Sequence, residues 1–211
     1  MIAFDPKALF DAIRAIKGAA LSQADVDAVN AVIAPQPHAD RRPIAWGAKV
    51  SPAFREKLWR WCEGFGADPD DPMACMAWES GRTFSPSVRN MAGSGATGLI
   101  QFMPAIALKL GTSVAALAAM TAEQQLDWVF RYFEPFRGRL KNLGDFYMAI
   151  LWPAGIGKPD SFVLWDRATR PTTYRQNIGL DVNRDGAITR GECLVKLNAI
   201  QAEGRKPENM A

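Results

Sequence analysis

The stretch of sequence that decides the fold runs from residue 77 to residue 107 and reads AWESGRTFSPSVRNMAGSGATGLIQFMPAIA. It contains one acidic residue, Glu79, and no Asp or Glu follows between residues 80 and 122. The segment MACMAW just before Glu79 is apolar and predicts a short buried helix. Its expected limits are Asp71 as the N-cap, Pro72 at the first helical position and Gly81 as the C-terminal stop. If Glu79 is catalytic, it must act without a nearby acidic partner.

Glu79 is expected in the last turn of this helix. Burial and the negative end of the helix dipole both disfavour its ionised form, so its pKa should be raised. A raised carboxyl pKa suits a general acid that works near neutral pH. The residues leave an ordinary alternative open, in which Glu79 forms an ion pair with Arg82 or Arg89.

Two motifs in this region resemble a known superfamily. The pair Glu79-Ser80, followed by GLIQFMP over residues 98–104, is similar to the signature of the lytic transglycosylase and goose-type lysozyme superfamily (SLT domain), and most similar to its phage-encoded branch. The third motif of that superfamily, commonly Ala-Tyr-Asn-Ala-Gly, corresponds to residues 151–155. Here Trp152 stands in place of the Tyr and Pro153 in place of the Asn. The resemblance covers residues 51–162.

The resemblance implies a mainly α, lysozyme-like catalytic domain that cleaves the β-1,4 bond between N-acetylmuramic acid and N-acetylglucosamine in peptidoglycan. It implies that Glu79 is the catalytic acid and base, and that the substrate-binding residues are Ser80, Gln101, Tyr147 and Trp152. Structural roles remain the alternative for each of the four, because polar residues at turns often satisfy backbone groups and large aromatic residues are usually core.

The chemistry of the second step stays open between two routes. Most glycosidases use two carboxylates, whereas in lytic transglycosylases the C6 hydroxyl of muramic acid closes a 1,6-anhydro ring and one glutamate serves twice. The acid-free stretch after Glu79 favours the transglycosylase route, with no cofactor. Hydrolysis by water, as in a lysozyme (muramidase), is the alternative, because four acids could fold back toward the cleft: Glu123, Asp127, Glu134 and Asp145. A non-catalytic wall-binding or tail-structural protein is the alternative from another class.

Other enzyme classes are not supported by the residues present. Gly93, Gly95 and Gly98 spell GxGxxG, but no apolar strand precedes them and Pro104 interrupts any following helix, which excludes a dinucleotide fingerprint. The single histidine, His38, lies in the proline-rich segment PQPHADRRP. A catalytic triad or a histidine-based zinc site therefore has no credible base or ligand.

Residues 181–192, DVNRDGAITRGE, match the pattern of an EF-hand calcium loop. The expected ligands are Asp181, Asn183, Asp185, the carbonyl of Ala187, Thr189 and Glu192. Residues 193–200 predict the helix that leaves the loop, while the helix that enters it is confined between Pro171 and Gly179. We expect a structural Ca²⁺ that ties the tail to the core, with an Asp- and Asn-rich turn as the alternative.

The 211 residues predict four parts, which are an N-terminal helical unit (1–34), a linker (35–50), the catalytic domain (51–165) and an EF-hand-like segment (166–211). In the first part, a second helix should begin at Ser22, with Asp25 completing a capping box. In the catalytic domain, helices are expected from Pro52, up to Glu79, and near 104–110, 113–119, 121–134 and 143–151. The glycine-rich segment 82–101 should line the groove.

Composition limits the partners. A net charge of +3 with scattered Lys and Arg gives no footprint for nucleic acid, and no apolar run approaches the ~20 residues of a membrane span. The first residues lack the pattern of a signal peptide. We expect synthesis in the cytoplasm with free thiols, a Cys62–Cys75 pair being the alternative. The expected partner is the peptidoglycan glycan strand in the periplasm, reached through a holin, a virion or a secretion machine.

Overall fold

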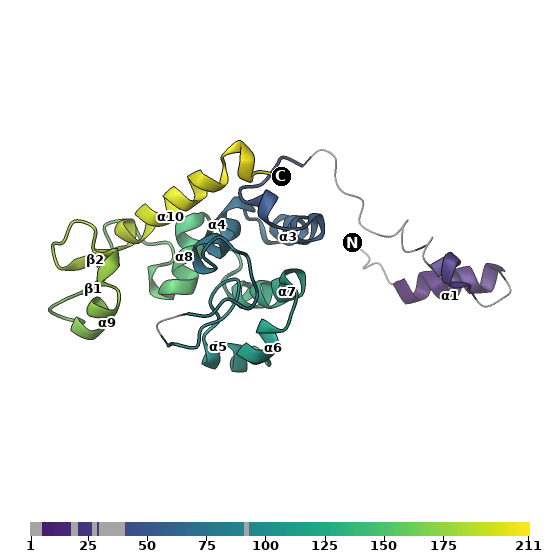
Figure 1. Ribbon diagram of the computed structural model, residues 1–211, viewed down its shortest axis with the longest axis horizontal. Helices are drawn as coiled ribbons and strands as arrows, with labels where there is room; N and C mark the ends of the chain where they lie inside the picture. The colour runs from purple at the N-terminus through teal and green to yellow at the C-terminus, as the bar shows by residue number, and fades with distance from the viewer. Residues whose placement is uncertain (1–5, 18–20, 27–28, 30–40, 91–92) are drawn as a thin grey trace. The chain divides into compact units, whose positions relative to one another are not determined.

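The computed structural model describes residues 6–17, 21–26, 29, 41–90 and 93–211 (Figure 1). It divides the chain into two compact units, residues 1–41 and residues 42–211. The described residues are mainly helical, with one two-stranded sheet. The expected mainly α class is confirmed. Within the described residues, no helix is long and apolar enough to cross a membrane.

The first unit contains helix α1 (Pro6–Lys17) and a helical turn at residues 23–26. The turn begins with the predicted capping box. The backbone N–H of Ser22 donates to Asp25 Oδ2 over 2.9 Å, and the backbone N–H of Asp25 donates to Ser22 Oγ over 3.2 Å. Residues 30–40, which include His38 and part of the expected linker, lie outside the described residues.

The second unit carries all the elements that position the site. Its α-helices are α3 (Pro52–Phe65), α4 (Asp70–Glu79), α5 (Pro104–Lys109), α6 (Val114–Ala118), α7 (Ala122–Phe133), α8 (Leu143–Leu151), α9 (Pro171–Gln176) and α10 (Arg190–Gly204). Its 3₁₀-helices are η1 (Gly47–Lys49), η2 (Glu134–Phe136), η3 (Pro153–Gly155), η4 (Ile178–Leu180) and η5 (Pro207–Asn209). Strands β1 (Val163–Asp166) and β2 (Ala187–Thr189) pair antiparallel, with Trp165 opposite Ile188.

Side-chain caps explain where several helices begin. A side-chain oxygen on each of five residues accepts the backbone N–H of the residue three positions on, which satisfies a donor that has no partner within the helix. These residues are Ser51, Ser113, Thr121, Asn142 and Thr189. The observed bounds confirm the helices expected between residues 52 and 151, with ends within about two residues of the expected ones.

Helix α4 lies at the centre of the core. Residues 73–77 have no exposed surface, because α8 and α10 pack along α4 (Figure 1). The helix begins at Asp70, with Pro69 as the N-cap, so the predicted cap at Asp71 is wrong. Both aspartates lie in the first turn, where negative charge favours the helix.

Asp70 fixes the start of α4 to two distant segments. It is 2% exposed. Its Oδ1 accepts from the backbone N–H of Ala45 over 2.8 Å and from Arg42 Nη1 over 3.1 Å, and its Oδ2 accepts from Arg205 Nε over 2.9 Å. The carboxylate that could have capped its own helix is used instead to join residues 42–45 and the end of α10.

The linker expected over residues 35–50 requires correction for residues 42–50. Ile44, Ala45 and Trp46 are at most 1% exposed, and Trp46 donates from its backbone N–H to Gly204 O and from Nε1 to Ile200 O, each over 3.1 Å. The proline-rich composition predicted a linker, but the apolar residues Ile44, Ala45 and Trp46 that follow the prolines are buried in the core. Likewise α10 packs on α4, so residues 42–211 form one unit with no boundary at 165.

The three cysteines, Cys62, Cys75 and Cys193, are buried and free. The alternative pairing of Cys62 with Cys75 is therefore not observed.

We predict that Asp70→Ala destabilises the second unit more than removal of a surface carboxylate. The substitution leaves the buried N–H of Ala45 without its acceptor and removes the Arg205 ion pair. It also removes one of the two carboxylates bound by Arg42, which keeps its ion pair with Asp68. The loss should cost about 2–4 kcal/mol and lower Tm by about 5–10 °C. The control is Asp127→Ala, which removes an exposed ion pair with Lys57 and should change Tm little. Equal effects in calorimetry would contradict the role given to Asp70.

Candidate active site

The end of α4 is fixed by a backbone motif. Gly81 has φ +61°. The N–H of Arg82 donates to Ala77 O over 2.7 Å, and the N–H of Gly81 donates to Trp78 O over 3.3 Å. This is a Schellman motif, which needs a left-handed residue after the helix. The predicted stop at Gly81 is confirmed, and Glu79 is the last helical residue.

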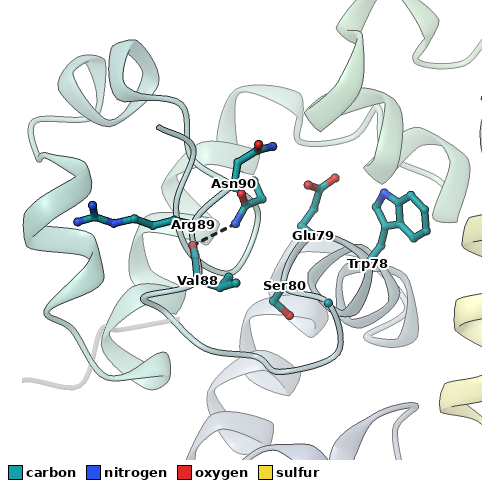
Figure 2. Close-up of a pocket in the computed structure, with 8 residues that line it drawn as sticks. Trp78, Glu79, Ser80, Val88, Arg89 and Asn90 are labelled. Atoms are coloured by element: carbon teal, nitrogen blue, oxygen red, sulfur yellow. Dashed lines mark hydrogen bonds between the residues drawn. The ribbon is translucent and has the colours of Figure 1, made fainter. Parts of the chain in front are cut away.

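Glu79 lines a pocket of about 420 Å³ between the end of α4 and the loop that follows it. Its volume falls in the usual range for small-ligand sites. Figure 2 shows Asn90 across the pocket from Glu79. The residues that line the pocket are Trp78, Glu79, Ser80, Gly81, Val88, Arg89, Asn90 and Gln101.

The Glu79 carboxyl has no salt bridge or hydrogen bond with any described residue. Burial raises its pKa to about 7, which confirms the direction expected from the sequence. The alternative ion pairs are not observed. Arg82 binds Glu203 through Nη2 and Oε2 at 2.7 Å, and the side chain of Arg89 points away from Glu79 in Figure 2.

Three ionisable side chains that interact with the charge of Glu79, those of Tyr132, Tyr147 and Cys75, are neutral near pH 7. Burial, with a smaller contribution from the charge of Glu79, raises the pKa of Tyr132 to about 12 and also raises the pKa of Tyr147 and of Cys75. The indole N–H of Trp78 donates a hydrogen bond to the hydroxyl oxygen of Tyr147. Because Glu79 is desolvated and no described cation pairs with it, its protonated form is favoured well above the usual pKa range of a carboxyl.

A buried glutamine holds the loop that forms the other side of the pocket. Gln125, on α7, has no exposed surface. Its Oε1 accepts from Leu99 N over 2.7 Å, and its Nε2 donates to Pro86 O over 3.0 Å and to Leu117 O over 2.8 Å. A Cβ at Gly98 would lie 2.3 Å from Gln125 Oε1, so only glycine fits there. These bonds tie both arms of the loop to α6 and α7.

Gln101 reaches the pocket from a left-handed turn with φ +50°. Its Nε2 donates to Gly98 O over 3.1 Å and to Val88 O over 3.3 Å. Its Oε1 accepts no hydrogen bond from the described residues. The amide nitrogen therefore orients the side chain, and the oxygen is the atom left for a ligand.

Ser80 supports the site from within the protein. It is 1% exposed. Its hydroxyl donates to Met76 O over 2.6 Å and accepts from the N–H of Phe84 over 3.0 Å. Both partners are backbone groups, so Ser80 fixes the turn after Glu79.

The two aromatic residues expected at the substrate lie outside the pocket lining. Tyr147 is 3% exposed and belongs to the core. Trp152, half-buried at the end of α8, packs edge-on against Trp165 with centroids 5.6 Å apart, and Arg170 lies 5.1 Å from its ring centre. The aromatic residue that does line the pocket is Trp78.

None of the four acids considered as a second carboxylate lines the pocket. Glu123 accepts from the Ser51 hydroxyl, and Asp127 pairs with Lys57 at 2.8 Å. Glu134 pairs with Arg137 at 2.7 Å, and Asp145 pairs with Arg190 at 3.2 Å. Among the described lining residues, Glu79 is the one carboxylate.

No family model and no curated protein matches this chain. Its function must therefore be inferred from the geometry of the pocket and the chemistry of its lining residues.

The sequence pointed to the lining segment but not to its inward-facing side chains. The sequence did not single out Val88 and Asn90. Hydrogen bonds to Gln125, which lies 26 and 39 residues further along the chain than its partners in this segment, decide which side chains of residues 82–101 turn toward the pocket. Gln125 itself gave no signal, since a glutamine on an amphipathic helix usually lies at the surface.

The calcium-loop pattern lies in a second, separate place, between η4 and α10. Among the described residues, no three His, Cys, Asp or Glu side chains gather closely enough to hold a metal ion. Instead, the carboxylates accept backbone N–H groups of the loop. Asp185 Oδ1 accepts from Ala187 N over 2.8 Å, and Glu192 Oε1 accepts from Val182 N over 3.1 Å. Thr189 and Glu192 also form the capping box of α10.

We predict that Glu79→Gln stabilises the protein at high pH and not at low pH. Because the folded pKa is about 7 and the unfolded value is about 4.3, the wild-type carboxyl loses its stabilising contribution as pH rises through this window. The variant should be more stable at pH 8 by about 3–4 kcal/mol, or about 6–15 °C in Tm, and equal to wild type at pH 4. Glu134→Gln, an exposed control, should show no such gain; a Tm difference for Glu79→Gln that does not change with pH would contradict a raised pKa.

Proposed function

We propose that this protein cleaves peptidoglycan glycan strands at the bond between N-acetylmuramic acid and N-acetylglucosamine, as a lytic transglycosylase with a lysozyme-like catalytic domain. The observation that carries the proposal is Glu79, a carboxyl of raised pKa that lines an open pocket with no second carboxylate. In this proposal the protein acts on the bacterial cell wall as a phage lysin, and it reaches the wall through a holin, a virion or a secretion machine.

The proposed reaction uses Glu79 twice. Its protonated carboxyl donates a proton to the glycosidic oxygen as the bond to the anomeric carbon breaks. The C6 hydroxyl of the same muramic acid then bonds to the anomeric carbon and gives its proton to the Glu79 carboxylate. Glu79 is thereby restored to its protonated form, and the product ends in a 1,6-anhydro ring.

The surroundings of Glu79 favour a mechanism that uses one carboxylate over a mechanism that uses two. An inverting or retaining hydrolase needs a second acid roughly 5–10 Å from the first. The described acids nearest in sequence after Glu79 are engaged elsewhere, for example Glu134 with Arg137. An attacking hydroxyl supplied by the substrate needs no positioned water, so the lone acid favours transglycosylation over hydrolysis as in a lysozyme.

Three other lining residues have chemistry suited to a sugar. The Trp78 ring is a flat apolar face of the kind on which sugar rings stack. Gln101 Oε1 can accept from a sugar hydroxyl or acetamido N–H, and the Asn90 amide can donate and accept. Ser80 acts indirectly, because its two backbone bonds hold the turn that carries Glu79.

We predict that the cleavage rate at limiting substrate falls as pH rises through about 7, because the first step needs the protonated form of Glu79. On labelled sacculi, kcat/KM should fall about tenfold per pH unit above this value. If kcat/KM stayed unchanged between pH 6 and pH 9, Glu79 could not be the acid.

The products released from purified sacculi test the reaction itself by mass spectrometry. Wild type should release fragments ending in 1,6-anhydro-muramic acid, and Glu79→Gln should lower the rate by at least about 10²-fold. Glu134→Gln is the matched control and should be as active as wild type.

Two other outcomes would contradict the proposal in different ways. Fragments heavier by one water, ending in reducing N-acetylmuramic acid, would identify a lysozyme. Binding to sacculi without any released fragment would identify a non-catalytic wall-binding protein.

A further inference from the structure

One buried charged oxygen in the loop of residues 181–192 has no partner. Asp181 is 8% exposed, and its Oδ1 is buried without a hydrogen bond from any described residue. Its Oδ2 accepts from the Tyr174 hydroxyl over 2.6 Å and from the N–H of Gly186, across the loop, over 3.1 Å. The carboxylate is thus held in the loop interior. A buried carboxylate oxygen normally has a donor or a cation beside it.

The backbone around Asp181 has the shape that such a cation needs. Gly186, at the sixth position of the loop, has φ +91°, where a side chain would be strained. Ile188, at the eighth position, has no exposed surface and pairs with Trp165 across the sheet. The loop is therefore anchored to β1 and enters α10 directly.

The other candidate ligands are close in the chain but turned to backbone donors. Glu192 Oε1 accepts from Val182 N over 3.1 Å and from Asn183 N over 3.3 Å, and Asp185 Oδ1 accepts from Ala187 N over 2.8 Å. Each carboxylate oxygen has a second acceptor site. Rotation of the Asp185 and Glu192 side chains toward Asp181 would gather three carboxylates, and a cation would offset their mutual repulsion.

We propose that residues 181–192 bind one Ca²⁺ with weak affinity. The oxygens of Asp181, Asn183, Asp185, Thr189 and Glu192, with the carbonyl of Ala187, supply the hard oxygen ligands that Ca²⁺ prefers.

The affinity is set by the charges beside the loop. Two cations lie beside the three carboxylates: Arg167 donates to the carbonyl of Asp185 over 3.2 Å, and Arg184 belongs to the loop itself. Less net negative charge gives weaker binding, so Kd falls between about 10⁻⁵ and 10⁻³ M. A site of this class is filled at millimolar Ca²⁺ and empty at submicromolar Ca²⁺.

The bound ion would stabilise the unit that carries the pocket. Arg190, the first residue of α10, is 6% exposed and donates from Nη2 to Asp145 Oδ1 on α8 over 3.2 Å. The same oxygen accepts from Gly157 N over 2.8 Å. At its other end, α10 holds Arg82 through Glu203. A cation that binds only the folded loop therefore raises the stability of residues 42–211 as one unit.

Terbium luminescence and calcium titration of the full chain test the site without any use of enzymatic activity. Tb³⁺ bound beside Tyr174 and Trp165 should luminesce on aromatic excitation, and Ca²⁺ should displace it with a Kd in the stated range. Addition of 5 mM Ca²⁺ to EDTA-treated protein should raise Tm by about 5 °C. Mg²⁺, which demands smaller octahedral sites, should raise it less.

Variants assign the effect to the loop. Glu192→Gln should weaken Ca²⁺ binding at least tenfold, and Asn183→Ala, at an exposed position, should also weaken it. Glu208→Gln, at an exposed position outside the loop, should bind as wild type. The proposal is overturned by the absence of luminescence and of any Tm shift up to 10 mM Ca²⁺, by equal shifts with Mg²⁺, or by wild-type affinity in both loop variants.

Discussion

Burial of residues 70–77 of α4 is the constraint on which the rest of the structure depends. Its apolar residues allow α8 and α10 to pack along it, and the last residue, Glu79, is carried into surroundings that are poor in charge. The Schellman motif and the Ser80 hydroxyl fix the helix end, so Glu79 cannot move toward a counter-ion. The nearest cation in sequence, Arg82, is taken by Glu203. The fold thereby holds a proton at a carboxyl near neutral pH, at a cost in stability when that proton leaves.

A second constraint is the uncharged side chain of Gln125, which fixes the loop across the pocket from Glu79. The Gln125 amide makes three hydrogen bonds to backbone groups of separate segments, and the close approach at Gly98 leaves room for no side chain there. The loop across from Glu79 is therefore rigid where it meets α7 and turns Gln101 and Asn90 to the pocket. A charged residue at position 125 would be costly in a site with no exposed surface. Acid and loop are thus held by independent parts of the core.

Local signals in the sequence predicted much of this arrangement. Apolar patterns and capping residues located the helices, and Gly81 located the end of α4. The errors share one physical cause, which is that tertiary partners override local chemistry. Asp71 was favoured as a cap, but Asp70 is drawn to Arg42 and Arg205, which are 28 and 135 residues away. Trp46 follows a proline-rich segment, yet its indole bonds to Ile200, 154 residues away. Trp152 was expected at the sugar because residues 151–155 resemble the third motif of the superfamily, but it lies outside the pocket lining and packs on Trp165.

The central claim is that Glu79 keeps its proton near neutral pH because it is buried without a counter-ion. Carbon-13 NMR of protein labelled at the glutamate carboxyl tests this claim most directly, with Glu79→Gln used to assign the resonance. The account predicts that this resonance titrates with a pKa of about 7. A midpoint near the ordinary glutamate value of about 4.3 would mean that the Glu79 carboxyl is solvated or paired in solution, and it would contradict the account.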